Sequence, residues 1–102
     1  MNPVLLTQEE LNAALCSLPD WSLDAGELTR TFRFATYLDG AAFVTRVAER
    51  ADAMDHHPEL HLGWRKVILR VHTHSAGGIT ALDIALAELA DLLHESKVSR
   101  HA

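Results

Sequence analysis

The sequence predicts an α+β fold: a two-layer sandwich in which a four-stranded antiparallel sheet has helices packed on one face. Near the start, in the middle and at the end of the chain, apolar residues recur every three or four positions, the spacing of one helix face. Between these stretches lie two pairs of short segments that alternate apolar and polar residues, as half-buried strands do. The resulting order, α-ββ-α-ββ-α, favours this class of fold. With 102 residues, the chain is expected to form a single domain over residues 1–102.

The first helix is expected to begin after Thr7, because Thr7 and Glu10 have the spacing of a capping box. A stripe of leucines follows, and Pro19 ends the helix because proline lacks the backbone N–H that a helix interior needs. Two short strands over residues 21–23 and 28–34 then form a pair joined by a tight turn.

The second helix is predicted over residues 39–54, where an apolar stripe recurs at helical spacing. It must end before Pro58, because the residue preceding a proline is pushed out of the helical conformation. Residues 59–74 alternate again, but their apolar members change from even to odd positions near residues 63–66. Such a change is typical of a β-hairpin with a tight turn at that point. The last helix is expected to open at Thr80.

The composition excludes several classes of protein. The net charge of −5, with seven histidines counted as neutral, argues against a nucleic-acid partner. No apolar run approaches the ~18 residues that a membrane span needs, and the first residues lack the features of a signal peptide. The single cysteine, Cys16, can form no intrachain disulfide. A cytoplasmic protein is therefore expected.

Histidines concentrate in the predicted hairpin, since five of the seven lie between His56 and His74. If the turn is centred near residue 65, paired residues have numbers that sum to about 130. That register places His56 opposite His74, and His57 opposite Thr73. Asp83, near the start of the next helix, would close the same end of the sheet.

Acidic residues precede this histidine cluster. Asp52 lies four residues before His56, a helical spacing that lets its carboxylate hydrogen-bond that imidazole. Unpaired carbonyl groups at the end of the second helix favour a positive charge there, as do Asp52 and Asp55. Because histidine changes protonation near neutral pH, the cluster predicts general acid/base chemistry.

Some of these residues have an equally good structural interpretation. Thr80 and Asp83 also fit a capping box, so Asp83 is expected to be either a helix cap or a catalytic group. Asp52 fits a solvated residue on a polar helix face as well as it fits a partner of His56.

A metal site is the main chemical alternative. His72 and His74 share a strand face, and His56 or Asp55 would complete a ligand set. Against this alternative, the neighbouring His56 and His57 cannot easily point to one ion from an extended segment before a proline. No metal is therefore expected.

The remaining aromatic, cysteine and histidine residues are interpreted as structural. We expect Trp21 in the core, Trp64 in the core or in the hairpin turn, and Cys16 as a buried small side chain. The histidines outside the cluster's motif positions are expected at the surface, with His72 the one that lines the site: His61, His72, His94 and His101.

The spacing of the site residues resembles the signature of the pterin-4a-carbinolamine dehydratases. That family has an acidic residue, a His-His-Pro triplet, an aromatic residue, a third histidine and an aspartate at the positions occupied here by Asp52, His56, His57, Pro58, Trp64, His74 and Asp83. The segment from Leu18 to Trp21 resembles the family's Leu-Pro-Gly-Trp, with Asp20 in place of the glycine. The resemblance covers essentially the full chain.

This resemblance implies a hydro-lyase that converts 4a-hydroxy-tetrahydropterin to quinonoid dihydropterin, recycling the pterin cofactor of aromatic amino acid hydroxylases. It implies no metal and no organic cofactor. His57 and His74 would be the acid/base pair around the 4a-hydroxyl group, and His56, held by Asp52, would position the substrate. The implied catalytic set is His56, His57, His74 and Asp83, and the implied substrate contacts are Asp52, His56, His57, Pro58, Thr73, His74, Ser75 and Ala76.

The resemblance also implies a homodimer or a homotetramer, a small-molecule pterin as partner, and no nucleic acid or membrane. Some members of this family serve as dimerization partners of transcription factors, and related proteins act as assembly factors without dehydratase activity. The assembly factors typically depart from the histidine motif, which is intact here. A non-catalytic binding module of the same fold is therefore the alternative to the enzyme.

Overall fold

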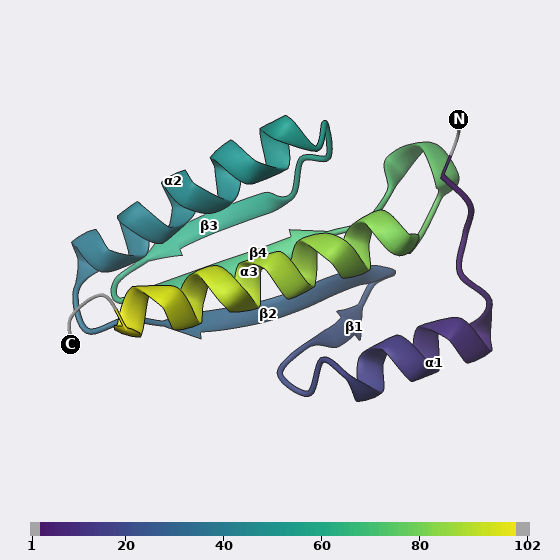
Figure 1. The fold of residues 1–102 in the computed structure, drawn as a ribbon, viewed down its shortest axis with the longest axis horizontal. Coiled ribbons are helices and arrows are strands. Elements are labelled where there is room, and N and C mark those ends of the chain that lie inside the picture. Colours follow the sequence, from purple (N-terminus) through teal and green to yellow (C-terminus); the bar gives the residue numbers. More distant parts are fainter. Residues whose placement is uncertain (1–2, 100–102) are drawn as a thin grey trace.

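The computed structural model describes residues 3–99, which form a two-layer arrangement of helices and one antiparallel sheet (Figure 1). The strands lie in the order β1-β2-β4-β3. Their bounds are β1 (Ser22–Asp24), β2 (Glu27–Arg33), β3 (Glu59–Gly63) and β4 (Lys66–Val71). The predicted α+β class, with a four-stranded antiparallel sheet, is confirmed.

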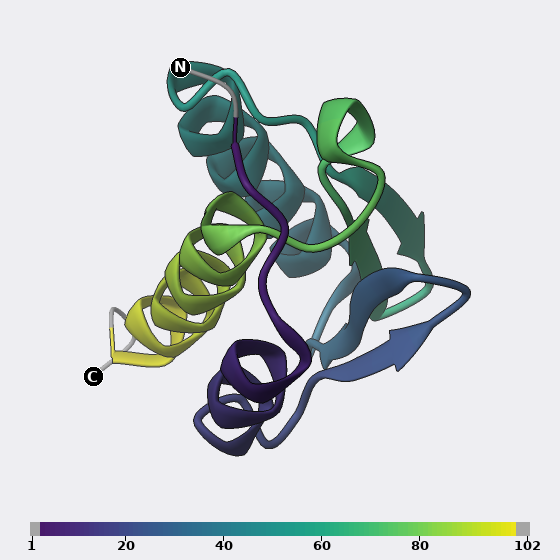
Figure 2. The same cartoon turned by 90° about the vertical axis from the view of Figure 1, so that its right-hand side faces the viewer.

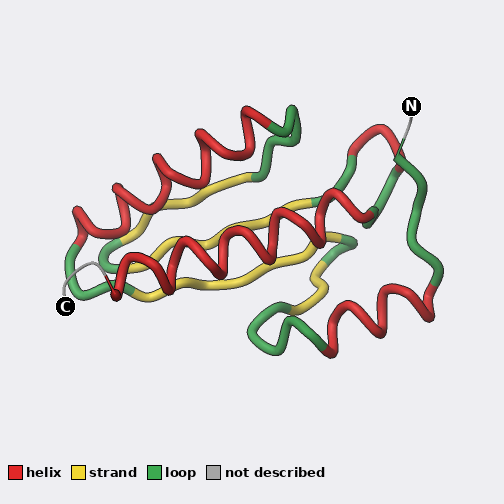
Figure 3. Tube along the Cα trace, in the orientation of Figure 1, coloured by secondary structure: helices red, strands yellow, loops and turns green. Residues whose placement is uncertain are grey.

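The helices lie on one side of the sheet, as the view in Figure 2 shows. They are α1 (Gln8–Cys16), α2 (Tyr37–Ala53) and α3 (Ala81–Ser99). Helix α2 packs against α3, β3 and β4, while α3 also covers β2. The other face of the sheet carries no described helix. A short 3-10 helix, η1 (His74–Ala76), lies in the connection from β4 to α3 (Figure 3). None of the described helices is long and apolar enough to cross a membrane.

Local capping signals fix the helix starts. The Thr7 side chain accepts a hydrogen bond from the Glu10 backbone N–H at 3.1 Å, and the Glu10 carboxylate accepts one from the Thr7 N–H at 2.8 Å, so the predicted capping box is confirmed. Helix α2 begins two residues earlier than predicted. The reason is a second cap, because the Thr36 hydroxyl accepts a hydrogen bond from the Asp39 N–H at 3.0 Å.

The core lies between the sheet and helices α2 and α3. Phe32 and Phe43 are fully buried, and Trp21 packs edge-on against Phe32 at 5.9 Å between ring centroids, as expected of a core tryptophan. His94, predicted at the surface, is half-buried. Its ring centroid lies 5.2 Å from those of Phe32 and Phe34, and its Nε2 donates to the Arg33 carbonyl at 3.1 Å. His101, also expected at the surface, lies outside the described residues.

The hairpin of β3 and β4 turns where the sequence predicted, but its register differs by one residue. Gly63 pairs with Lys66, and Glu59 pairs with Arg70, so each pair of residue numbers sums to one less than expected. Trp64 and Arg65 form the turn, with Arg65 in the left-handed region at φ 60°. The ladder ends at Glu59 and Arg70, so His56 and His74 lie outside it, and Thr73 instead forms a bridge with Gly78. The predicted pairings of His56 with His74 and of His57 with Thr73 are therefore wrong.

Trp64 and Cys16, for which burial was one expectation, are both exposed. Trp64 lies at the hairpin turn, one of the two positions expected for it, and its side chain is 73% exposed. The Arg65 guanidinium lies 4.9 Å from the centroid of its ring. Cys16 is exposed at the end of α1, a helix with no buried residue, so its predicted burial is wrong. Hydrophobic spacing identified the helix but not the side on which Cys16 faces.

Arg30, a charged residue among apolar ones on β2, has a specific place in this core. Its Nη1 donates to Asp91 Oδ1 on α3 at 2.5 Å, and the same oxygen accepts from Trp21 Nε1 at 2.9 Å. The Arg30 guanidinium also lies 4.3 Å from the ring centroid of Phe32. One carboxylate therefore satisfies two donors and joins β2 to α3.

We expect Asp91→Ala to lower the free energy of unfolding by about 2–4 kcal/mol, because it leaves a half-buried guanidinium without its closest partner. Urea unfolding followed by circular dichroism measures the change. Glu88→Ala, an exposed site on the same helix, is the matched control and should change stability by less than about 0.5 kcal/mol. Equal losses in the two variants would contradict this role of Asp91.

Candidate acid/base site

Histidine side chains from two segments meet at the end of the sheet where β4 leads into η1. A hollow of about 350 Å³ is lined there by residues that follow α2 and β4: Asp55, His56, His57, His72, Thr73, His74 and Ser75. A hollow of about 510 Å³ and a smaller one of about 110 Å³ adjoin it. Both share His72 and His74 with it, and the smaller one also shares His57. The predicted meeting of His56, His57 and His74 at one end of the sheet is what the structure has, although not through the register that was expected.

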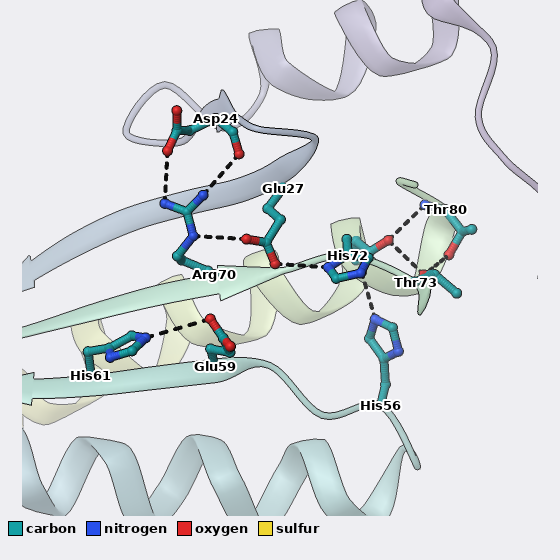
Figure 4. A network of polar contacts seen from close by, with 10 residues as sticks. Asp24, Glu27, His56, Glu59, His61, Arg70, His72, Thr73 and Thr80 are labelled. Atoms are coloured by element: carbon teal, nitrogen blue, oxygen red, sulfur yellow. Dashed lines mark hydrogen bonds and ion pairs between the residues drawn. The ribbon is translucent and has the colours of Figure 1, made fainter. Parts of the chain in front are cut away.

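Asp83 is the buried centre of this end of the molecule. Its side chain is fully buried, and its Oδ1 lies 2.6 Å from His56 Nε2. Its Oδ2 accepts from the Thr73 hydroxyl at 2.7 Å and from the Thr80 backbone N–H at 2.8 Å. The Thr80 hydroxyl lies 2.8 Å from that of Thr73, and it donates to it because the Thr73 proton already points to Asp83. Figure 4 shows the side chains of His56, Thr73 and Thr80 close to one another at this end of the sheet.

Asp83 therefore caps α3, as one of the two interpretations of the sequence required, and it holds an imidazole at the same time. Its side chain is fully buried and lines none of the three hollows. Asp83 contacts His56, which is itself 8% exposed and lines the 350 Å³ hollow. The buried carboxylate therefore fixes the position of the His56 ring.

The predicted contact between Asp52 and His56 is wrong. Helix α2 ends at Ala53, and Asp55 adopts a left-handed conformation at φ 53° that turns the chain inward. The His56 N–H bonds the Ala51 carbonyl at 3.0 Å, and its side chain enters the interior toward Asp83. Asp52 instead contacts His57, with 3.1 Å between Oδ1 and Nε2. That pair is mostly exposed, so it is weak.

The sequence did not predict a second, partly buried carboxylate at this site, on the open face of the sheet. Glu27, at the start of β2, lies 2.8 Å from His72 Nδ1 through Oε2 and 2.9 Å from Arg70 Nε through Oε1. Arg70 also reaches the Asp24 carboxylate at 3.0 Å (Figure 4). Hydrogen bonds from Arg70 and then from His72 hold the pKa of Glu27 below its ordinary value. The bond to Glu27, followed by that to Asp24, raises the pKa of Arg70.

The pairing of β2 with β4 explains why Glu27 and His72 meet. Leu28 pairs with Val71 across β2 and β4, so Glu27 and His72 are the next residues along the same two strands. Opposite charges at adjacent positions of paired strands attract one another. The pairing of β2 with β4, however, is a tertiary fact that the alternation of residues within each strand does not reveal.

Only some of the other expected site residues line the hollows. Thr73 is buried, while Ser75 and the exposed His74 line the 350 Å³ hollow. Three residues do not line any of the three hollows: Asp52, Pro58 and Ala76. Trp64 lies at the hairpin turn, away from the histidines. His72 lines the site, as predicted.

The metal alternative receives no geometric support. Within residues 3–95, whose side chains are described, no group of three or more histidine, cysteine, aspartate or glutamate side chains is arranged to hold an ion. The rings of His72 and His74 lie edge to face with 6.0 Å between centroids. The carboxylates nearby bind His56, His57 and His72 one at a time.

Comparisons with known proteins bear on this arrangement. The family model described as pterin 4 alpha carbinolamine dehydratase matches residues 4–93. Two relatives carry that enzyme's name provisionally. One, from Mycobacteroides abscessus, is 47% identical over 87 residues, covering 85% of this chain and 93% of the relative. The other, from Streptomyces coelicolor, is 48% identical over 83 residues, covering 80% and 82%.

Solved structures show the same fold. A crystal structure described as a transcriptional coactivator/pterin dehydratase from Brucella melitensis superposes with a TM-score of 0.82 at 34% identity, covering 87% of this chain and 97% of that one. A pterin dehydratase-like protein described as a RuBisCO assembly factor of the alpha-carboxysome gives a TM-score of 0.59 at 21% identity, over 72% and 86% of the two chains. The second likeness concerns the fold alone.

The buried and exposed carboxylate–histidine pairs should respond differently to truncation. We expect Asp83→Ala to lower the free energy of unfolding by about 2–4 kcal/mol, because it strands three buried hydrogen-bonding groups. Asp52→Ala should change it by less than about 0.5 kcal/mol, because its partner His57 stays solvated. Urea denaturation of both variants makes the comparison, and a loss in Asp52→Ala as large as in Asp83→Ala would contradict it.

The lowered pKa of Glu27 makes part of the stability depend on pH. The ionised carboxylate stabilises the folded state above the unfolded value of 4.5, and this contribution is lost as the pH falls through the lower folded value. We therefore expect the stability difference between the native chain and Glu27→Gln to be largest above the unfolded value and to shrink in acid. Unfolding curves measured between about pH 3 and pH 7 test this, and a difference that stays constant over that range would contradict it.

Proposed function

Because the chain belongs to the pterin 4 alpha carbinolamine dehydratase family, we propose that it is a hydro-lyase acting on a 4a-hydroxy-tetrahydropterin. The product is the quinonoid dihydropterin. One observation carries the proposal: three histidines at the family's spacing, His56, His57 and His74, line one hollow although they come from segments on either side of a hairpin. Neutral imidazole and imidazolium coexist near pH 7, which suits a reaction that needs both an acid and a base.

The dehydration requires two proton transfers. An imidazolium donates a proton to the 4a-oxygen, which leaves as water when the C4a–O bond breaks. A neutral imidazole takes the proton from the adjacent ring nitrogen, and the electron pair of that N–H bond forms the C=N double bond. We assign His57 and His74 to the neighbourhood of the 4a-hydroxyl group, since both line the 350 Å³ hollow and both are exposed to an entering substrate.

The remaining motif residues hold the substrate and its surroundings in place. His56 is fixed by Asp83 and reaches the hollow from its buried side. Thr73 and Ser75 line the same hollow, and the backbone of this turn offers amide groups that suit the flat, amide-like edge of a pterin. The proposed binding surface therefore extends from His56 and His57 across to residues 73–75.

On the family resemblance we also propose where the protein acts and how it assembles. It is cytoplasmic, it helps to recycle the pterin cofactor of an aromatic amino acid hydroxylase, and it forms a homodimer or a homotetramer. The exposed free Cys16 fits a reducing compartment. The sheet face without a helix and the exposed Leu38 and Trp64 offer surface for self-association.

A second candidate function is a binding module, because the Brucella melitensis structure is described both as a transcriptional coactivator and as a pterin dehydratase. The two functions are compatible on one fold. The complete histidine set favours catalysis here, since a surface used only for docking has no need of a buried carboxylate behind an imidazole.

A stopped-flow assay on freshly generated 4a-hydroxy-tetrahydropterin tests the proposal. We expect the native chain to accelerate dehydration over buffer, and His74→Ala to lose about 10²–10⁴-fold of that rate, the usual contribution of a general acid or base. His61→Ala, an exposed histidine on β3 outside the hollows, is the control and should retain the native rate. A native chain no faster than buffer would overturn the proposal and favour the binding module.

A further inference from the structure

We propose that His72, oriented by Glu27, is an additional general base of this site and accepts the proton that the pterin ring nitrogen loses. The inference rests on the proposed function and adds to it a residue outside the family motif described above. It assigns to Glu27 the role of a positioning residue. His57 and His74 then serve the leaving hydroxyl group.

The position of His72 is the first argument. Together with His74 it lines all three adjoining hollows at this end of the sheet. The rings of the two histidines are in edge-to-face contact, with 6.0 Å between their centroids. A flat bicyclic substrate that reaches His74 therefore also reaches His72.

The orientation of the His72 ring is the second argument. Its Nδ1 lies 2.8 Å from Glu27 Oε2, so the neutral ring that donates this hydrogen bond carries its lone pair on Nε2. In the part of the chain that the structure describes, Nε2 makes no hydrogen bond. This is the tautomer that a base needs, with the acceptor nitrogen directed away from the carboxylate.

Glu27 is itself held in place by Arg70. Arg70 binds its other oxygen at 2.9 Å and is anchored in turn on Asp24 at 3.0 Å, as Figure 4 shows. Because Arg70 and His72 keep the pKa of Glu27 low, the carboxylate is negative at neutral pH. It then stabilises the imidazolium that forms when His72 takes up a proton.

The other carboxylate–imidazole pairs of the site are less suited to this task. The His56–Asp83 pair is buried, with Asp83 fully covered. The His57–Asp52 pair is mostly exposed and loosely held, with side chains 61% and 82% exposed. His74 has no carboxylate within hydrogen-bonding distance among the described residues. The His72–Glu27 pair combines a carboxylate that is held by Arg70 with an imidazole that lines the hollows and is 36% exposed.

The transfer balances without another reactant. The ring N–H bond breaks, its proton goes to His72 Nε2, and its electron pair forms the C=N bond as the C4a–O bond breaks. The oxygen leaves as water with a proton supplied by His57 or His74, and the solvent-open hollow lets His72 release its proton afterwards. The charged and titratable groups that line the three hollows with His72 are Glu27, Asp55, His56, His57, Glu59, Arg70 and His74. Asp24 adds a negative charge behind Arg70.

The test is the pH–rate profile of kcat/KM for the full chain and three variants. We expect His72→Asn to lose at least about tenfold and to lose the ionisation that limits the rate on the acid side. Glu27→Gln should lose less and should move that acid limb to lower pH, because it removes the charge that favours the imidazolium. The matched control is His61→Asn, which removes an exposed histidine that also pairs with a glutamate, at 3.6 Å from Glu59. It should keep the native profile.

Other results of these assays distinguish a failure of the His72 proposal from a failure of the dehydratase proposal. Free imidazole added to His72→Ala should restore part of the lost rate, which a purely structural loss would not allow. If the native chain is active and His72→Asn lies within twofold of it, or loses rate while keeping the native acid limb, the inference is overturned and the dehydratase proposal stands. If the native chain is inactive, the dehydratase proposal itself fails.

Discussion

One buried carboxylate, that of Asp83, holds the candidate site together. It receives hydrogen bonds from three segments: the turn after α2 at His56, the connection after β4 at Thr73, and the start of α3 at Thr80. Burying a carboxylate is costly unless every lone pair finds a donor. The requirement for those donors therefore fixes where the three segments lie, and with them the histidines that border the hollow.

Around this fixed centre, the imidazoles differ in how they are held. His56 is locked against a covered carboxylate, His57 pairs with an exposed one, and His72 pairs with Glu27, whose other oxygen is taken by Arg70. Burial strengthens a hydrogen bond and exposure weakens it. One residue type thus has different partners and different access to solvent within a single site.

The two faces of the sheet have different roles in this small protein. One face is covered by helices and carries the aromatic core, while the open face carries the ion pairs of Asp24, Glu27 and Arg70. The site lies at the sheet end where β4 runs into η1. The relatives described as a coactivator/dehydratase and as an assembly factor share this fold. The fold therefore does not specify the activity, and the function has to be argued from the side chains at that end.

Short-range patterns in the sequence were sufficient to predict the class of fold, the capping box of Thr7 and Glu10, and the turn at Trp64 and Arg65. They also identified the histidine cluster, because these features depend on residues a few positions apart. Longer-range choices were beyond such patterns. The left-handed Asp55 turned His56 away from Asp52 and toward Asp83, and the hairpin closed one residue away from the expected register.

Tertiary packing alone decided the remaining partners. The pairing of β2 with β4 brought Glu27 to His72, and the packing of α3 placed His94 among phenylalanines while α1 left Cys16 in solvent. Periodicity tells which residues of an element share a face, but it does not tell which element covers that face. For that reason the sequence by itself determined the elements and the residue types of the site, and only the folded chain decided which carboxylate binds which histidine.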